Sequence, residues 1–184
     1  MKQTNSITML FLAILSIPLQ NHQSAGVCRH ETKYDDVSDT TTVQCDNLIK
    51  WGEAAAGLTI QANASFRGKE ANETAKFWFF LSSNKGGATR RTQLLFREAT
   101  TLYLSTGSAQ LKVPVKDYRD TFFELTRSIS ESARAEVDRD DLQKLLDAKT
   151  LEGKWGNVEF KVSDAALASL KNFISRQVFA THIR

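Results

Sequence analysis

Apolar and polar residues alternate strictly from Leu58 to Arg67, and this pattern predicts an extended strand for the segment. A period of two places every second side chain on the same face of an extended strand. A helix would instead spread these apolar residues around its circumference. The segment is therefore predicted to be a half-buried strand whose buried face carries Leu58, Ile60, Ala62, Ala64 and Phe66.

Later segments also carry strand patterns. The consecutive apolar residues between Thr74 and Ser83 indicate a strand that is covered on both faces. Pro114 cannot donate a ladder hydrogen bond, so its strand is expected at a sheet edge or a bulge. Residues 26–57 are polar and are expected to be largely irregular. Further short strands are predicted at 93–97, 101–105, 111–115, 123–125 and 133–137, and on both sides of a turn at 153–157.

Two helices are predicted in the last third of the chain. Asp138 can cap a helix that runs to about Lys149, and Ser163 can cap a second one that runs to about Arg176. The second helix has an apolar stripe that we expect to pack on the sheet, made of Leu167, Leu170, Phe173 and Ile174. The predicted fold class is α+β: an antiparallel sheet of roughly six to eight strands with two C-terminal helices packed on it.

The N-terminus has the features of a secretory signal peptide. Lys2 precedes an apolar run of about 13 residues from Ile7 to Leu19, which is shorter than the roughly 20 residues of a membrane-spanning helix. Small residues follow, and cleavage is expected after Ala25 or Gly26. The prediction is a signal peptide at 1–25 and one domain at 26–184. The mature chain should then be exported to the periplasm or outside the cell, without an integral membrane segment.

The chain has two cysteines, Cys28 and Cys45. Exported compartments favour disulfides, and a bridge would close a loop of about 18 residues, worth about 3 kcal/mol in the chain-entropy model. A metal pair or a catalytic thiol is the alternative, but the two residues lack Cys-x-x-Cys spacing. The expected role of Cys28 and Cys45 is therefore a disulfide.

The sequence offers few groups for catalysis or cofactor binding. The formal charge of +3 comes from scattered basic residues, so no nucleic-acid partner is expected. No phosphate-binding or zinc motif is present, and no cofactor or metal is predicted. The aspartates at 35–39 and 138–141 fit a turn and a helix start better than a calcium loop. Packing is the expected role of Trp155, with a surface contact as the alternative. A carboxylate pair among Glu124, Glu136 and Glu159 is the remaining catalytic option.

The segment from Tyr34 to Val43 resembles a region near the mature start of uncharacterised secreted bacterial proteins. The shared pattern is Tyr-Asp-x-x-x-Asp-x-Thr-Thr-Val. The stretch Gly156–Phe160, followed by the helix that Ser163 caps, is similar to the end of such proteins. This resemblance implies a bacterial exported protein and implies no activity.

These observations favour a non-catalytic structural, binding or adaptor domain of the bacterial envelope. Its partner would be a protein or a small-molecule ligand that the sequence does not identify. The alternative is a secreted hydrolase or carbohydrate-binding protein that uses scattered carboxylates and Trp155. A pocket that holds two carboxyl groups with raised pKa values would favour this alternative.

Overall fold

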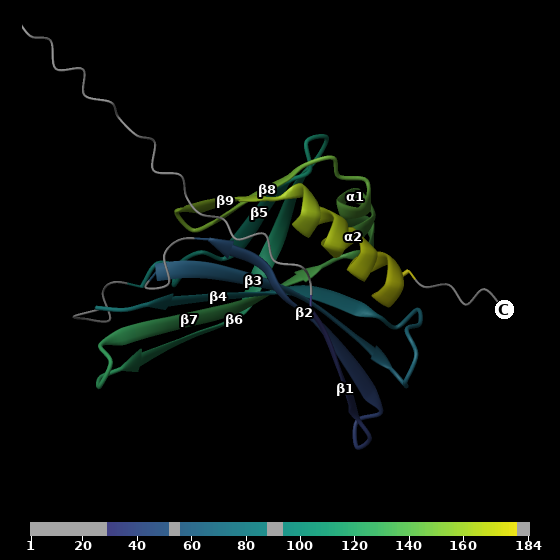
Figure 1. The fold of residues 1–184 in the computed structure, drawn as a ribbon, viewed down its shortest axis with the longest axis horizontal. Helices are drawn as coiled ribbons and strands as arrows, with labels where there is room; N and C mark the ends of the chain where they lie inside the picture. The colour runs from purple at the N-terminus through teal and green to yellow at the C-terminus, as the bar shows by residue number, and fades with distance from the viewer. Residues whose placement is uncertain (1–28, 52–55, 88–93, 180–184) are drawn as a thin grey trace, which may run out of the picture.

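A computed structural model describes residues 29–51, 56–87 and 94–179, and it shows one antiparallel sheet with two helices. The nine strands follow the order β1-β2-β3-β4-β7-β6-β5-β8-β9, and the sheet curls into a half-barrel (Figure 1). The predicted combination of an antiparallel sheet and two C-terminal helices is confirmed, although the sheet has more strands than predicted. The strands are β1 (Arg29–Asp35), β2 (Thr40–Trp51), β3 (Ala56–Arg67), β4 (Lys76–Lys85), β5 (Thr101–Ser105), β6 (Gln110–Phe123), β7 (Ser128–Val137), β8 (Leu151–Trp155) and β9 (Val158–Val162).

The buried face of the sheet follows from strand alternation. The five apolar residues predicted to share one face of β3 are all buried. In β4, only alternate residues such as Phe77 and Phe79 are buried, while Trp78 and Phe80 are half-buried on the outer face. The prediction that this strand is covered on both faces is therefore wrong. The outer face of Trp78 is instead covered in part by the guanidinium group of Arg134, which lies 4.1 Å from the centre of the indole ring.

The helices cover the inner face of the sheet. Helix α1 spans Arg139–Leu146, and α2 spans Asp164–Gln177. Ser163 Oγ accepts a hydrogen bond from Ala166 N at 3.3 Å, which confirms the predicted cap of α2. The four residues of its predicted apolar stripe are all buried, and α2 packs against β2, β3 and α1. Phe173 makes an edge contact with Phe77, with ring centres 6.1 Å apart.

Three local predictions were wrong. Much of 26–57 forms β1 and β2, where β1 is an edge strand with one hydrogen-bonded neighbour and therefore tolerates a polar sequence. Residues 95–98 form a turn instead of a strand, because Leu95 and Phe96 donate their backbone N–H groups to a side chain. Residues 123–125 end one strand and enter a turn, where Leu125 is fully exposed.

Strand β6 changes partners along its length, and this change positions the outer part of the sheet. It pairs with β5 up to Pro114 and with β7 from Val115 onward. A bulge follows between Lys116 and Arg119, with Asp117 at a φ of 54°. Pro114 is the last residue of β6 that pairs with β5. It therefore lies inside the sheet and not at its edge. The strands β5, β8 and β9 form the part of the sheet beyond this bend (Figure 1).

Candidate functional site: a polar groove on the outer sheet face

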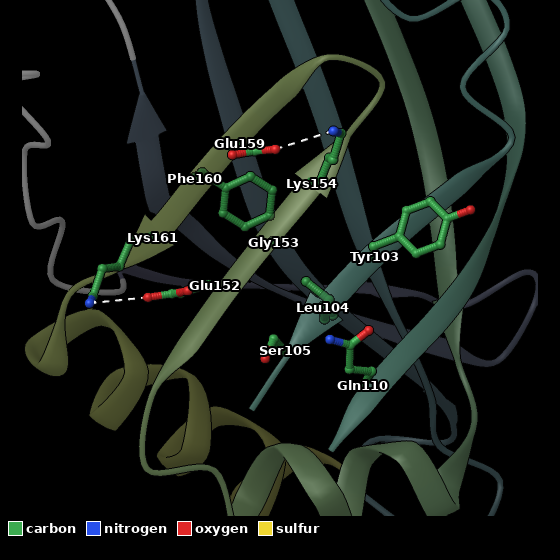
Figure 2. Close-up of a pocket in the computed structure, with 10 residues that line it drawn as sticks. All are labelled: Tyr103, Leu104, Ser105, Gln110, Glu152, Gly153, Lys154, Glu159, Phe160 and Lys161. Atoms are coloured by element: carbon green, nitrogen blue, oxygen red, sulfur yellow. Dashed lines mark hydrogen bonds and ion pairs between the residues drawn. The ribbon is translucent and has the colours of Figure 1, made fainter. Parts of the chain in front are cut away.

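A groove of about 480 Å³ lies on the outer face of β5, β8 and β9 (Figure 2). Its volume falls in the range of about 300–1,000 Å³ that is usual for ligand pockets. Strand pairing arranges the lining side chains in two rows that cross the strands. One row carries Tyr103, Lys154 and Glu159, and the other carries Gln110, Ser105, Glu152 and Lys161.

The four charged side chains of the groove form two cross-strand ion pairs. Lys154 Nζ lies 3.2 Å from an oxygen of Glu159, and Lys161 Nζ lies 3.1 Å from an oxygen of Glu152. Both pairs join residues that are directly opposite in the β8–β9 ladder. The two lysines offset the two glutamates, so the lining has no net formal charge.

The other polar side chains of the groove are neutral. Tyr103 is 47% exposed, and it lies opposite Lys154 in the ladder. Ser105 is short and lies between Gln110 on β6 and Glu152 on β8, which deepens the surface at this point. Within the described part of the chain, the side chains of Tyr103, Ser105 and Gln110 make no side-chain hydrogen bond. Their hydrogen-bonding groups are therefore available to a ligand.

The floor of the groove depends on a glycine. Gly153 lies directly opposite Phe160, and the phenyl ring of Phe160 lies across it (Figure 2). A Cβ atom at position 153 would come within 2.6 Å of Phe160 Cε2, so even alanine would displace the ring. The aromatic ring fills the space beside the glycine and supports the strand pair, which keeps the outer charged rows in register.

The β8–β9 hairpin is held to the rest of the molecule by Trp155. Its indole ring stacks on Phe96, with ring centres 3.8 Å apart, and its Nε1–H donates to Ala99 O at 3.1 Å. Trp155 is fully buried, so the surface contact suggested from its turn-like sequence is not observed. Packing, the role expected for this residue, is the one that the structure shows. The flanking Gly156 leaves room for the backbone of Leu95.

A buried carboxylate holds the same segment from the other side. Glu131 on β7 is 2% exposed and accepts hydrogen bonds from Leu95 N and Phe96 N, both at 2.9 Å. It also accepts a hydrogen bond from the hydroxyl of Tyr118 at 2.8 Å. Burial, followed by the hydrogen bond to Glu131, raises the pKa of Tyr118 well above its ordinary value. These three hydrogen bonds join β7 to residues 95–96 and to Tyr118.

The acidic clusters have local structural roles. The first lies at the β1–β2 hairpin, where Asp35 accepts hydrogen bonds from Ser38 Oγ and Val37 N that lower the pKa of Asp35. In the second, Asp138 precedes α1, and Asp141 lies 2.7 Å from Lys144 Nζ. No set of three or more His, Cys, Asp or Glu side chains in the described ranges is placed to hold a metal ion.

The other predicted site residues are placed as follows. Glu124 lies in the turn after β6, and Glu136 and Glu159 lie on β7 and β9, which three strands separate. Cys45 is fully buried on β2. Cys28 is outside the described residues, as is the predicted signal peptide at 1–25, so the disulfide stays a prediction.

Of the residues that form the groove, sequence reasoning named Glu159 as a candidate carboxylate and missed the other polar ones. Tyr103, Ser105 and Lys154 each occupy an outward position of an alternating strand, which a sequence pattern interprets as ordinary solvated surface. The charge alternation of Glu152 and Lys154 against Glu159 and Lys161 was the available signal, because a tight hairpin brings these residues opposite one another.

Comparisons with known proteins add no relative. The chain matches no family model, no curated protein and no solved structure. Neither of the helices described here has the length and apolar character needed to cross a membrane. The interpretation of the groove therefore depends on its own geometry.

Proposed function

We propose that the protein is an exported, non-catalytic binding domain of the bacterial envelope, whose ligand surface is the groove on β5, β8 and β9. The observation that carries this proposal is the composition of the groove: neutral polar groups without side-chain partners lie beside charges that are already paired. The signal-like N-terminus and the resemblance of the segment Tyr34–Val43 to secreted bacterial proteins support export.

The carboxylates of the groove do not have the surroundings of a hydrolase acid. A general acid in glycoside hydrolysis holds its proton because it lies in an apolar environment. The side chains of Glu152 and Glu159 are instead 56% and 74% exposed, and each contacts a lysine ammonium group. Neither carboxylate therefore has the apolar surroundings of such a general acid.

A groove-filling variant tests the proposal. Mature protein is sedimented with cell-envelope material from the organism that encodes it, and the bound fraction is compared with that of Ser105→Trp. We expect the indole to fill the groove and to lower the bound fraction at least about tenfold. Thr121→Trp is the matched control, because Thr121 is exposed on β6 away from the groove and should bind as the wild type does.

Two results would contradict the proposal. The first is equal sedimentation of the wild type and Ser105→Trp, which would exclude the groove as the ligand surface. The second is a time-dependent release of soluble products that the double variant Glu152→Gln, Glu159→Gln abolishes. Removal of a general acid or base typically costs about 100-fold or more in rate, and this loss would identify a hydrolase.

A further inference from the structure

We propose that the groove binds a neutral, polyhydroxylated chain, that is, an uncharged oligosaccharide. This inference rests on the proposed binding function and names the class of its ligand. It follows from three features of the lining: the charges are mutually compensated, the free hydrogen-bonding groups are neutral, and one aromatic ring is exposed.

The ion pairs disfavour a charged ligand. An anion could bind Lys154 or Lys161 only by competing with a carboxylate that is already within 3.2 Å of the ammonium group. A cation meets the same competition at the glutamates. Because the four charges of the lining sum to zero, the lining itself gives neither kind of ion a net attraction. A neutral ligand can form hydrogen bonds with the remaining lone pairs of the glutamates and N–H groups of the lysines without breaking either ion pair.

The uncommitted side chains match hydroxyl groups. Ser105 and Tyr103 each have a hydroxyl that donates and accepts, and the amide of Gln110 offers both a donor and an acceptor. Sugar hydroxyls have the same dual character, so each can satisfy one of these groups. The three residues come from adjacent strands and lie around the same hollow (Figure 2). A chain of hydroxylated rings can therefore meet them together.

Tyr103 provides an apolar surface in this polar lining. Its side chain projects from the outer face of β5 and is 47% exposed, although it lies between the ladder partners Lys112 and Lys154. An aromatic ring with a polar tip suits a ligand that has C–H groups on one face and hydroxyls at its edge. Pyranose rings have this distribution of surface, whereas extended polar peptides do not present such a regular apolar face.

The test is a titration of the isotope-labelled mature protein, followed by backbone amide chemical shifts. The neutral probes are cellohexaose, maltohexaose and the hexamer of N-acetylglucosamine. The charged probes are hexaglutamate and hexalysine. We expect at least one neutral probe to shift amides of β5, β8 and β9 with a Kd below about 1 mM, and we expect neither peptide to do so.

Matched tyrosine variants identify the contribution of the ring. Tyr103→Ala should weaken binding of the same sugar by about three- to tenfold, whereas Tyr103→Phe should keep the stacking part of the affinity. Tyr34→Ala is the control, because Tyr34 is 39% exposed on β1, far from the groove in strand order, and its loss should leave the affinity unchanged.

Other outcomes would overturn the inference. Binding of a charged peptide in the groove, or no shift from any neutral probe up to about 10 mM, would exclude an uncharged sugar as the ligand class. If the sugar test failed but Ser105→Trp still bound less envelope material than the wild type, the proposed binding function would stand and the ligand would belong to another class. Loss of sugar binding in Tyr34→Ala but not in Tyr103→Ala would place the sugar elsewhere on the protein.

Discussion

Replacement of Glu131 by glutamine should destabilise the fold, although the two side chains have nearly the same shape. The carboxylate is buried and accepts three hydrogen bonds, two from the backbone N–H groups of Leu95 and Phe96 and one from Tyr118. Both Phe96 N and Tyr118 donate to the same oxygen. An amide oxygen at that position could keep these two bonds, but the amide nitrogen would then face the N–H of Leu95.

The cost can be worked out from these contacts. One hydrogen bond to a charged acceptor is lost and one N–H donor is left without an acceptor, which together cost about 2–4 kcal/mol. Removal of a buried charge returns part of that cost. We expect Glu131→Gln to lower the free energy of unfolding by about 2–3 kcal/mol. This corresponds to a fall of about 1 M in the urea midpoint.

Urea denaturation of a chain that begins at residue 26 measures this change. Glu159→Gln is the matched control, because the side chain of Glu159 is 74% exposed and its loss should change the free energy of unfolding by less than about 0.5 kcal/mol. Tyr118→Phe should cost about 1–2 kcal/mol and should be non-additive with Glu131→Gln. A Glu131→Gln midpoint equal to that of the wild type would refute the idea that this carboxylate anchors residues 95–96.

Three further predictions concern other parts of the fold. Because the pKa of Tyr118 is raised, its stabilising contribution is complete below pH 10 and is lost as pH rises through the folded pKa. The free energy of unfolding should therefore fall less steeply above pH 10 in Tyr118→Phe. Tyrosinate absorbance should show one more tyrosine with a raised pKa in the wild type than in this variant. Phe173→Ala should cost about 3–5 kcal/mol in urea denaturation because the ring is buried, whereas Asn172→Ala on the exposed face should cost under about 0.5 kcal/mol; equal midpoints would mean that α2 does not pack on the sheet. Thiol labelling of the unreduced, denatured protein should find no free thiol, and labelling of both Cys28 and Cys45 would disprove the bridge.

The local sequence pattern was sufficient to predict burial wherever the environment of a residue depended only on its own strand or helix. The alternation of Leu58 to Arg67 predicted which face of β3 is buried, and the spacing that includes Phe173 predicted the buried stripe of α2. The cap at Ser163 was also predicted, because a cap involves residues only three positions apart.

The pattern failed where burial depended on a distant element. The apolar run of β4 gave no sign that helices cover only the inner face, so Trp78 was expected to be buried rather than half-buried beside Arg134. Packing was favoured for Trp155, but its turn-like sequence left a surface contact open and identified no packing partner. It is buried because Phe96, nearly 60 residues earlier in the chain, stacks on its ring.

Alternation within the predicted strand 101–105 assigned Tyr103 and Ser105 to the face away from the core, whereas Lys154 was expected in a turn. Strand pairing across the sheet brings all three residues side by side. Their proximity depends on the pairing of β5 with β8, which joins segments about 50 residues apart and places β6 on the other side. Periodicity reports the face of a strand but not its neighbour, because strand order is set by long-range pairing and by the entropy of closing the intervening loop.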